Sequence, residues 1–174
     1  MLETSLLLIV VILVSSIVLI VIAIGIYNGL VKDKNLVAAG WSDIDVQLKR
    51  RHELIPRLVE CVRAYADHEK ATLEAVTELR KQSDATDDIA EKAVIESAVA
   101  DGVQRLVVTV EEYPELKADE NFRELQRELV DTEDKIQYAR RFYNGAVRNL
   151  NTRIQSFPGV LLAQPLGFSP AQFF

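Results

Sequence analysis

The fold is decided first by residues 6–26, which read LLLIVVILVSSIVLIVIAIGI. This stretch contains no charged residue, and its only polar side chains are those of Ser15 and Ser16. A helix that is apolar on every face does not suit a water-soluble surface, where one side must be polar. At a rise of about 1.5 Å per residue the stretch spans roughly 31 Å, which matches a hydrocarbon core of about 30 Å. We therefore predict a transmembrane helix over Leu6–Ile26, with the lipid bilayer as its partner.

A cleaved signal peptide is the rival interpretation of an apolar N-terminal stretch. Such a peptide needs a positively charged start, a shorter apolar run and a cleavage site of small residues. Here the chain starts Met1-Leu2-Glu3, and the run is followed by Tyr27-Asn28-Gly29. The pattern favours a retained anchor over a removed leader.

The charges on either side of the anchor predict its orientation. Residues 1–5 contain Glu3 but no Lys or Arg, whereas Lys32 and Lys34 follow the apolar stretch closely. Basic residues near a membrane helix stay on the cytoplasmic side. We expect a single-pass protein of the cell (plasma) membrane, with residues 1–5 as a short extracytoplasmic N-terminus and the following domain in the cytoplasm. A single cysteine, Cys61, leaves no intrachain disulfide and agrees with a reducing compartment.

The distribution of charge argues against a nucleic-acid partner. Residues 27–63 hold seven basic and five acidic side chains, and residues 64–174 hold thirteen basic and twenty acidic ones. No basic patch with interleaved aromatic residues occurs in either part. The mildly basic part follows the anchor directly, which suits a domain that stands on an anionic leaflet.

Residues 27–157 are expected to be helical almost throughout, because glycine and proline are scarce before residue 158. Apolar residues recur at steps of three and four, most regularly from Phe122 to Ile154. Long helices with short connections pack as antiparallel neighbours. The sequence therefore predicts an all-α fold, in which the N-terminal transmembrane helix is followed by an antiparallel up-and-down four-helix bundle.

The expected helix boundaries follow from breaks in this pattern. Proline removes a backbone donor and clashes with the preceding turn, so Pro56 predicts a kink or tight turn near His52–Ile55. Asp88 and Glu91 have the spacing of a helix cap, and Gly102 indicates close packing in mid-helix. The helices are expected over residues 30–52, 56–82, 89–112 and 120–155.

Residues 158–174 form an apolar tail that contains Pro and Phe. It has no charge, and three prolines make it too broken to span a membrane. Apolar side chains this numerous are expected to be shielded from water by packing against another surface. It either folds back into a groove of the bundle or docks on a partner subunit, a protease or the membrane surface.

Chemical sites are hard to find in this sequence. A di-iron bundle needs two Glu-x-x-His motifs, and neither His52 nor His68 has Glu three residues before it. His68-Glu69 begins like a zincin motif, but Thr72 occupies the place of the second His. Cys61 lies in an amphipathic stretch where a thiol usually packs. We predict no catalytic, cofactor-binding or metal-binding residues, no cofactor, and no evident small-molecule substrate.

Two further groups have open interpretations. Lys49-Arg50-Arg51 either meets lipid phosphate or forms a solvated face and ion pairs within the bundle. The region expected to be helical contains Asn144, Asn149 and Asn151, although Asn has a low helix propensity. Any of them that is buried must be hydrogen-bonded and is then a candidate for fixing helix register.

The sequence resembles the LemA family of membrane-anchored prokaryotic proteins. The most specific block is Trp41–Pro56, which reads WSDIDVQLKRRHELIP, and Arg57 after it departs from the Asn that the family usually has. The other matching segments are Tyr27-Asn28, Leu58-Val59-Glu60, Tyr65-Ala66, His68-Glu69, Tyr113–Ala118, Thr132-Glu133, Arg140–Asn144 and Phe157-Pro158.

The resemblance implies an all-α bundle with a cytoplasmic C-terminal domain, and it supplies no catalytic residues. Members of the family have been linked to membrane stress responses, membrane-bound metalloproteases and magnetosome formation. The expected function is therefore a membrane-anchored scaffold or interaction protein without catalytic activity, with a protein partner or self-association. The alternative is an adaptor or regulator of a membrane-bound protease in an envelope stress response.

Overall fold

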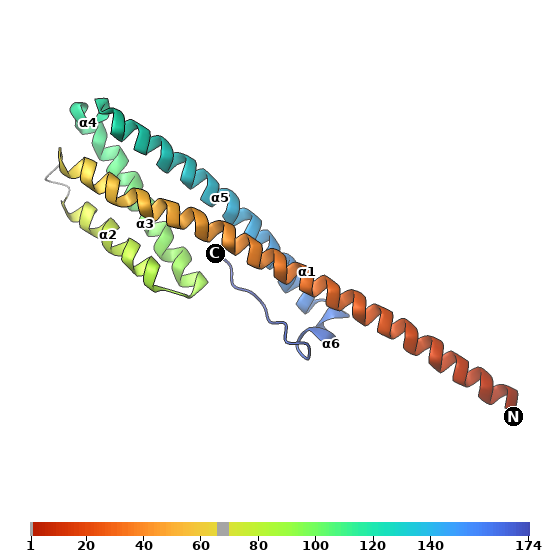
Figure 1. The fold of residues 1–174 in the computed structure, drawn as a ribbon. Helices are drawn as coiled ribbons and strands as arrows, with labels where there is room; N and C mark the ends of the chain where they lie inside the picture. The colour runs from red at the N-terminus through yellow and green to blue at the C-terminus, as the bar shows by residue number, and fades with distance from the viewer. Residues whose placement is uncertain (1, 66–69) are drawn as a thin grey trace. The chain divides into compact units, whose positions relative to one another are not determined.

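The computed structural model describes residues 2–65 and 70–174, and all the secondary structure in these ranges is helical (Figure 1). The elements are α1 (Leu2–Arg63), α2 (Lys70–Ala85), α3 (Ile89–Thr109), the short 3-10 helix η2 (Val110–Glu112), α4 (Pro114–Ala118), α5 (Glu120–Gln155) and α6 (Gly159–Ala163). The all-α prediction is confirmed.

The chain divides into two compact units. The anchor unit comprises Met1–Ala38 and Gly145–Ala171, and the bundle unit comprises Ala39–Asn144 and Gln172–Phe174. The helices α1 and α5 contribute residues to both units.

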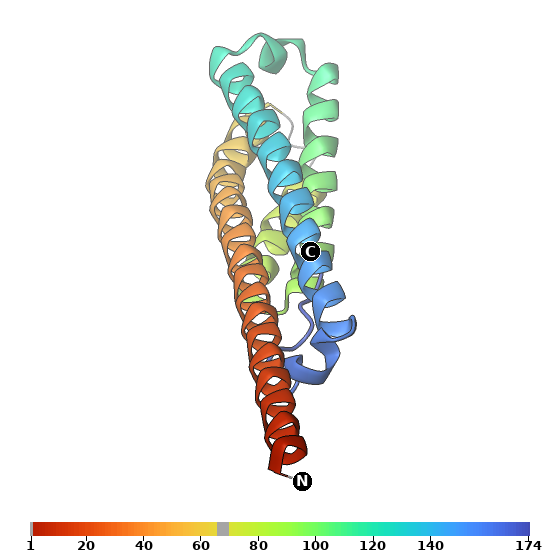
Figure 2. The same cartoon turned by 90° about the vertical axis from the view of Figure 1, so that its right-hand side faces the viewer.

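Four antiparallel helical segments build the bundle unit. The later part of α1 runs in one direction, α2 returns, α3 runs forward again, and the first part of α5 returns (Figures 1 and 2). Their apolar stripes meet in a core that includes Leu54, Leu58, Val76, Leu106 and Leu125. The up-and-down four-helix bundle predicted from the sequence is therefore present.

Helix α1 does not end at Pro56, so the tight turn predicted near His52–Ile55 and the helix start predicted at residue 56 are wrong. The helix continues to Arg63, and α2 begins at Lys70 rather than at residue 56. A proline at position 56 cannot donate to the carbonyl of His52, four residues earlier. The Nη1 of Arg80 in α2 donates to that carbonyl at 3.3 Å. A side chain from the neighbouring helix thus supplies the missing donor.

The later helices follow the sequence pattern closely. The fourth predicted helix, residues 120–155, coincides with α5, and α3 with η2 covers the third. Asp88 caps α3 by accepting a hydrogen bond from the backbone N–H of Glu91 at 2.8 Å. A Cβ added at Gly102 would lie 2.5 Å from Cγ2 of Val76, which explains the small residue there.

The last residues of the chain close one side of the bundle unit. Phe174 is 7% exposed and packs edge-on against Trp41, with the ring centroids 5.6 Å apart. The Asn144 side chain donates to the Phe174 carbonyl and accepts from its N–H, and the Tyr143 hydroxyl donates to the Gln172 carbonyl. This part of the tail folds back, as one of the two open interpretations expected.

The anchor unit has a small core of its own. Leu30 of α1 packs with Leu150 and Ile154 of α5 and with Ala163 and Phe168 of the tail. Asn151 and Ala171 exchange two hydrogen bonds of 2.8 and 2.9 Å. Arg153 donates to the buried Asp33 at 2.6 Å. The tail turns at Gly167, whose φ of 78° is one that other residues rarely adopt.

Within the described residues, α1 is the helix that is long and apolar enough to cross a membrane. The apolar side chains from Leu6 to Ile24 are exposed, so no protein core accounts for them. A membrane-associated chain explains this exposure, since lipid is the solvent in which such a surface is stable.

The packing of Phe174 against Trp41 gives a fluorescence test of the folded tail. Phe174→Ala opens the indole of the chain's only tryptophan to water, so its emission moves to longer wavelength. The same change removes a buried aromatic side chain and lowers the free energy of unfolding by about 3 kcal/mol. Phe173→Ala, at a side chain that is 49% exposed, is the matched control and leaves the emission unchanged. Equal spectra for both variants would contradict the packing.

Candidate functional site

A charged side chain occupies a core position of α1 in the bundle unit. Arg51 is 3% exposed, and it lies on the stripe whose other members are apolar. Counted in steps of three and four, the buried stripe runs Ile44, Leu48, Arg51, Ile55, Leu58 and Val62. A buried guanidinium is costly unless it is paired and hydrogen-bonded.

Carboxylates from two other helices pair with Arg51. Its Nη1 donates to Oε2 of Glu133 on α5 at 2.7 Å. Its Nη2 donates to Oε2 of Glu96 on α3, and also to the Glu96 backbone carbonyl at 3.0 Å. Gln137 donates to the other oxygen of Glu133 at 2.7 Å and so orients that carboxylate. The guanidinium therefore links α1, α3 and α5.

Glu96 is the most buried carboxylate of the group, at 1% exposure. Burial alone acts to raise its pKa, but the hydrogen bond with His52, the positive charge of Arg51 and the Ser83 hydroxyl outweigh it. Together they lower the pKa of Glu96 to about 2. The side chain is therefore ionised at neutral pH, and it has no proton to give as a general acid.

His52 hydrogen-bonds to Glu96 and to a second carboxylate, Asp84. Its Nδ1 lies 2.9 Å from Oδ1 of Asp84, and its Nε2 lies 2.8 Å from Oε1 of Glu96. An ionised carboxylate only accepts hydrogen bonds, so both ring nitrogens donate when the imidazole is doubly protonated. We call the set Arg51, His52, Ser83, Glu96 and Glu133 the charged layer; every bundle helix contributes to it.

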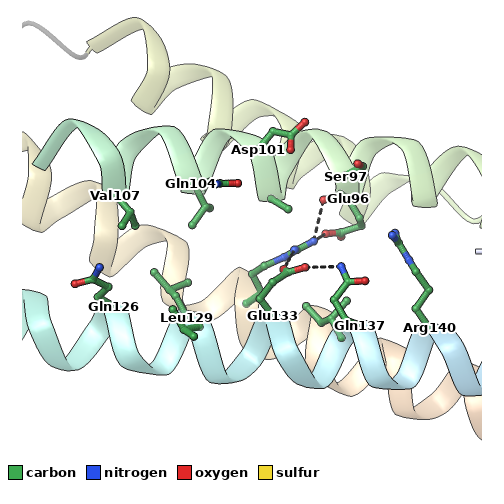
Figure 3. A pocket seen from close by; sticks show the side chains of 15 residues that line it. Glu96, Ser97, Asp101, Gln104, Val107, Gln126, Leu129, Glu133, Gln137 and Arg140 are labelled. Carbon is green, nitrogen blue, oxygen red and sulfur yellow. Dashed lines mark hydrogen bonds and ion pairs between the residues drawn. The ribbon is translucent and has the colours of Figure 1, made fainter. Parts of the chain in front are cut away.

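A groove lies between α3 and α5 and is lined in part by the charged layer, with a volume of about 480 Å³ (Figure 3). The apolar part of its floor includes the buried Val103, Leu129 and Ile136. Amide side chains border it, with Gln104 on α3 and Gln126 on α5 (Figure 3). The remaining lining residues are Arg51, Glu96, Ser97, Ala100, Asp101, Val107, Val130, Glu133, Gln137 and Arg140.

Among residues 2–65 and 70–174, no three His, Cys, Asp or Glu side chains converge in a way that could hold a metal ion. Burial, and then the negative charge of Asp119, raises the pKa of the Cys61 thiol, which therefore stays protonated as a poor nucleophile. The apolar floor and amide rims of the groove are typical of surfaces that receive another apolar group.

The basic run Lys49-Arg50-Arg51 forms ion pairs within the bundle unit, as one of its two open interpretations expected. Lys49 contacts Asp45 at 2.7 Å, and Arg50 lies 4.0 Å from Asp131. Asn144 and Asn151 hydrogen-bond to the tail backbone, whereas Asn149 is exposed.

His68 and Glu69, considered for a metal motif, lie outside the described residues. His52 instead faces Asp84 and Glu96.

The sequence analysis did not identify the charged layer, although the sequence contains a pattern that indicates buried charges. Arg51 falls on the apolar stripe of its helix, and Glu96 falls in register with the buried Val99 and Val103. A charge that interrupts a three-four stripe predicts a buried partner on another helix. The identity of that partner depends on how the helices align, which a single stripe does not specify.

An all-α bundle with one candidate membrane helix defines a membrane-associated helical-bundle protein. A model of the LemA family matches residues 40–174, and the chain belongs to the LemA family.

Two curated relatives resemble most of the chain. It is 24% identical to the magnetosome protein MamQ of Magnetospirillum gryphiswaldense, over 85% of this chain and 64% of that protein. It is 28% identical to protein LemA of Metamycoplasma hominis, over 82% of this chain and 66% of that protein. The matches thus span just under two thirds of the length of these two relatives.

The charged layer predicts a specific dependence of stability on pH. The pKa of Glu96 is about 2 in the folded protein against an ordinary value of 4.5, so its contribution is present above pH 4.5 and disappears as the pH falls toward 2. This contribution is about 3 kcal/mol. Glu96→Gln should lower the unfolding free energy at neutral pH and flatten its acid dependence. Unfolding of both proteins between pH 7 and pH 2 measures this, and equal slopes would refute it.

Proposed function

We propose that this protein is a membrane-anchored interaction protein without catalytic activity, and that the groove between α3 and α5 receives a helix of a partner protein. The groove is the observation that carries the proposal. Its floor is apolar over Val103, Leu129 and Ile136, and its rims carry amides that can hydrogen-bond to an incoming segment. An amphipathic helix places side chains of this kind into a groove at positions i, i+3, i+4 and i+7.

The size and edges of the groove support a protein partner. A volume of about 480 Å³ holds a few side chains of a docked helix, not its backbone. Val130, which lines the groove, remains 58% exposed to solvent. Apolar side chains at the edge of a groove extend the surface that a helix would cover.

The proposed location follows from the flanking charges. We propose that Leu6–Ile26 spans the plasma membrane, that residues 1–5 lie outside the cytoplasm, and that residues 27–157 form the cytoplasmic domain. Lys32 and Lys34 just after the anchor support this orientation. A bundle tethered in this way meets its partner at the membrane surface. A magnetosome protein among the relatives is compatible with a role at membranes.

Site-specific photo-crosslinking of the full chain in its native membrane tests the proposal. A photoreactive phenylalanine at Gln104 or Gln126 lies in the groove, whereas the same residue at the exposed Gln82 of α2 lies outside its lining. Since all three positions replace glutamine, the comparison isolates location. We expect adducts of one defined mass from Gln104 and Gln126 and none from Gln82.

The mass and sequence of the adduct identify the partner. An adduct with a membrane protease supports the adaptor role in a stress response, and one of twice the chain's mass supports self-association. Equal labelling from all three positions, or none from the groove, would overturn the proposal.

A further inference from the structure

The first part of the tail, where the chain turns after α5, exposes apolar side chains in the anchor unit. Phe157 is 79% exposed and Leu161 is 63% exposed, and Val160 and Leu166 are each 46% exposed. We call residues 157–166 the apolar elbow. Ala163 of this segment is fully buried. The elbow therefore packs against the anchor unit through Ala163, while its other apolar side chains are exposed to solvent. No charged residue occurs between Ile154 and Phe174.

The apolar elbow lies beside α1 where the predicted membrane span ends. Ala163, within the elbow, and Phe168, just after it, share a core with Leu30, and Ile26 packs against this core. Tyr27 meets the ring of Phe168 edge-on at 5.9 Å. The two views agree that α6 lies alongside α1 (Figures 1 and 2).

This position corresponds to the headgroup level of a bilayer. Since Leu6–Ile26 spans roughly 31 Å, Ile26 falls at the edge of a hydrocarbon core of about 30 Å. The polar layer of a bilayer adds about 5–8 Å on each side. Lys34, whose Nζ lies 5.9 Å from the Phe168 ring, is about 12 Å past Ile26 along the helix, so its cation lies on the water side of this layer, the side that faces lipid phosphate.

We propose that the apolar elbow inserts into the interfacial layer of the bilayer that the anchor spans. Phe157, Leu161 and Leu166 would enter the boundary between headgroups and acyl chains, while Ala163 and Phe168 hold the elbow to α1. Lipid is the occupant because the elbow is packed beside the end of the predicted span, at Ile26, Tyr27 and Leu30, and carries exposed apolar side chains and no charge. Such a contact fixes the rotation of α1 about its own axis within the membrane.

Spin-label accessibility in vesicles tests whether the apolar elbow inserts into the bilayer. The inference itself rests on the proposed membrane span of Leu6–Ile26. The full chain, with Cys61→Ala, is reconstituted in phosphatidylcholine vesicles containing a third of phosphatidylglycerol. One nitroxide is attached at Leu161→Cys. Matched labels are placed at Ile17→Cys in the anchor and at Val94→Cys in the bundle unit, where Val94 is aliphatic and 72% exposed. Collision with oxygen reports lipid, and collision with a water-soluble nickel complex reports water.

The label at Leu161 should show an oxygen-to-nickel ratio several times that at Val94, and Ile17 should show the highest ratio. A Leu161 ratio equal to that of Val94 would place the elbow in water and overturn the inference. Low collision with both reagents would show a protein cover, from a second copy or a partner, and would also overturn it. Failure of the proposed span is distinguishable, because Ile17 itself would then collide with nickel.

Discussion

A guanidinium buried in the core of a helical bundle is the constraint on which the rest of the bundle unit depends. Arg51 is 3% exposed, and it cannot be left unpaired at that depth. Its partners come from α3 and α5, and Glu96 in turn accepts from Ser83 on α2. Apolar stripes alone allow helices to slide by a turn with little loss of burial. Fixed charges do not allow this, because each slip would strand a buried charge.

The same constraint shapes the surface that the protein offers. Arg51, Glu96 and Glu133 all line the groove between α3 and α5, so the charged layer forms part of its wall (Figure 3). A fully ionised Glu96 suits this structural role better than a catalytic one, since its carboxylate is committed to holding Arg51.

The sequence predicted the elements whose cause is local. The stripe from Phe122 to Ile154 gave the bounds of α5, and the Asp88 cap gave the start of α3. Pro56 does not end α1, and the His52 carbonyl that it leaves without a backbone donor accepts a hydrogen bond from a distant side chain, Arg80, which no local pattern reveals. The charged layer and the packing of Phe174 on Trp41 also depend on residues far apart in sequence. Their presence could be suspected from polarity in a stripe and from an apolar tail, but their pairing needed the fold.

A double-mutant cycle between α1 and α3 tests most directly whether the charged layer specifies the bundle. The free energy of unfolding is measured for the full chain in detergent, and for its Arg51→Met, Glu96→Leu and doubly substituted variants. Each single change removes the main partner of a buried charge, although Glu133 still contacts Arg51 and His52 and Ser83 still contact Glu96, and should cost up to about 3–5 kcal/mol. The double variant should lose much less than the sum of the two, with a coupling of about 2 kcal/mol or more. Additive losses would contradict the role of the pair, because they would mean that Arg51 and Glu96 do not depend on each other.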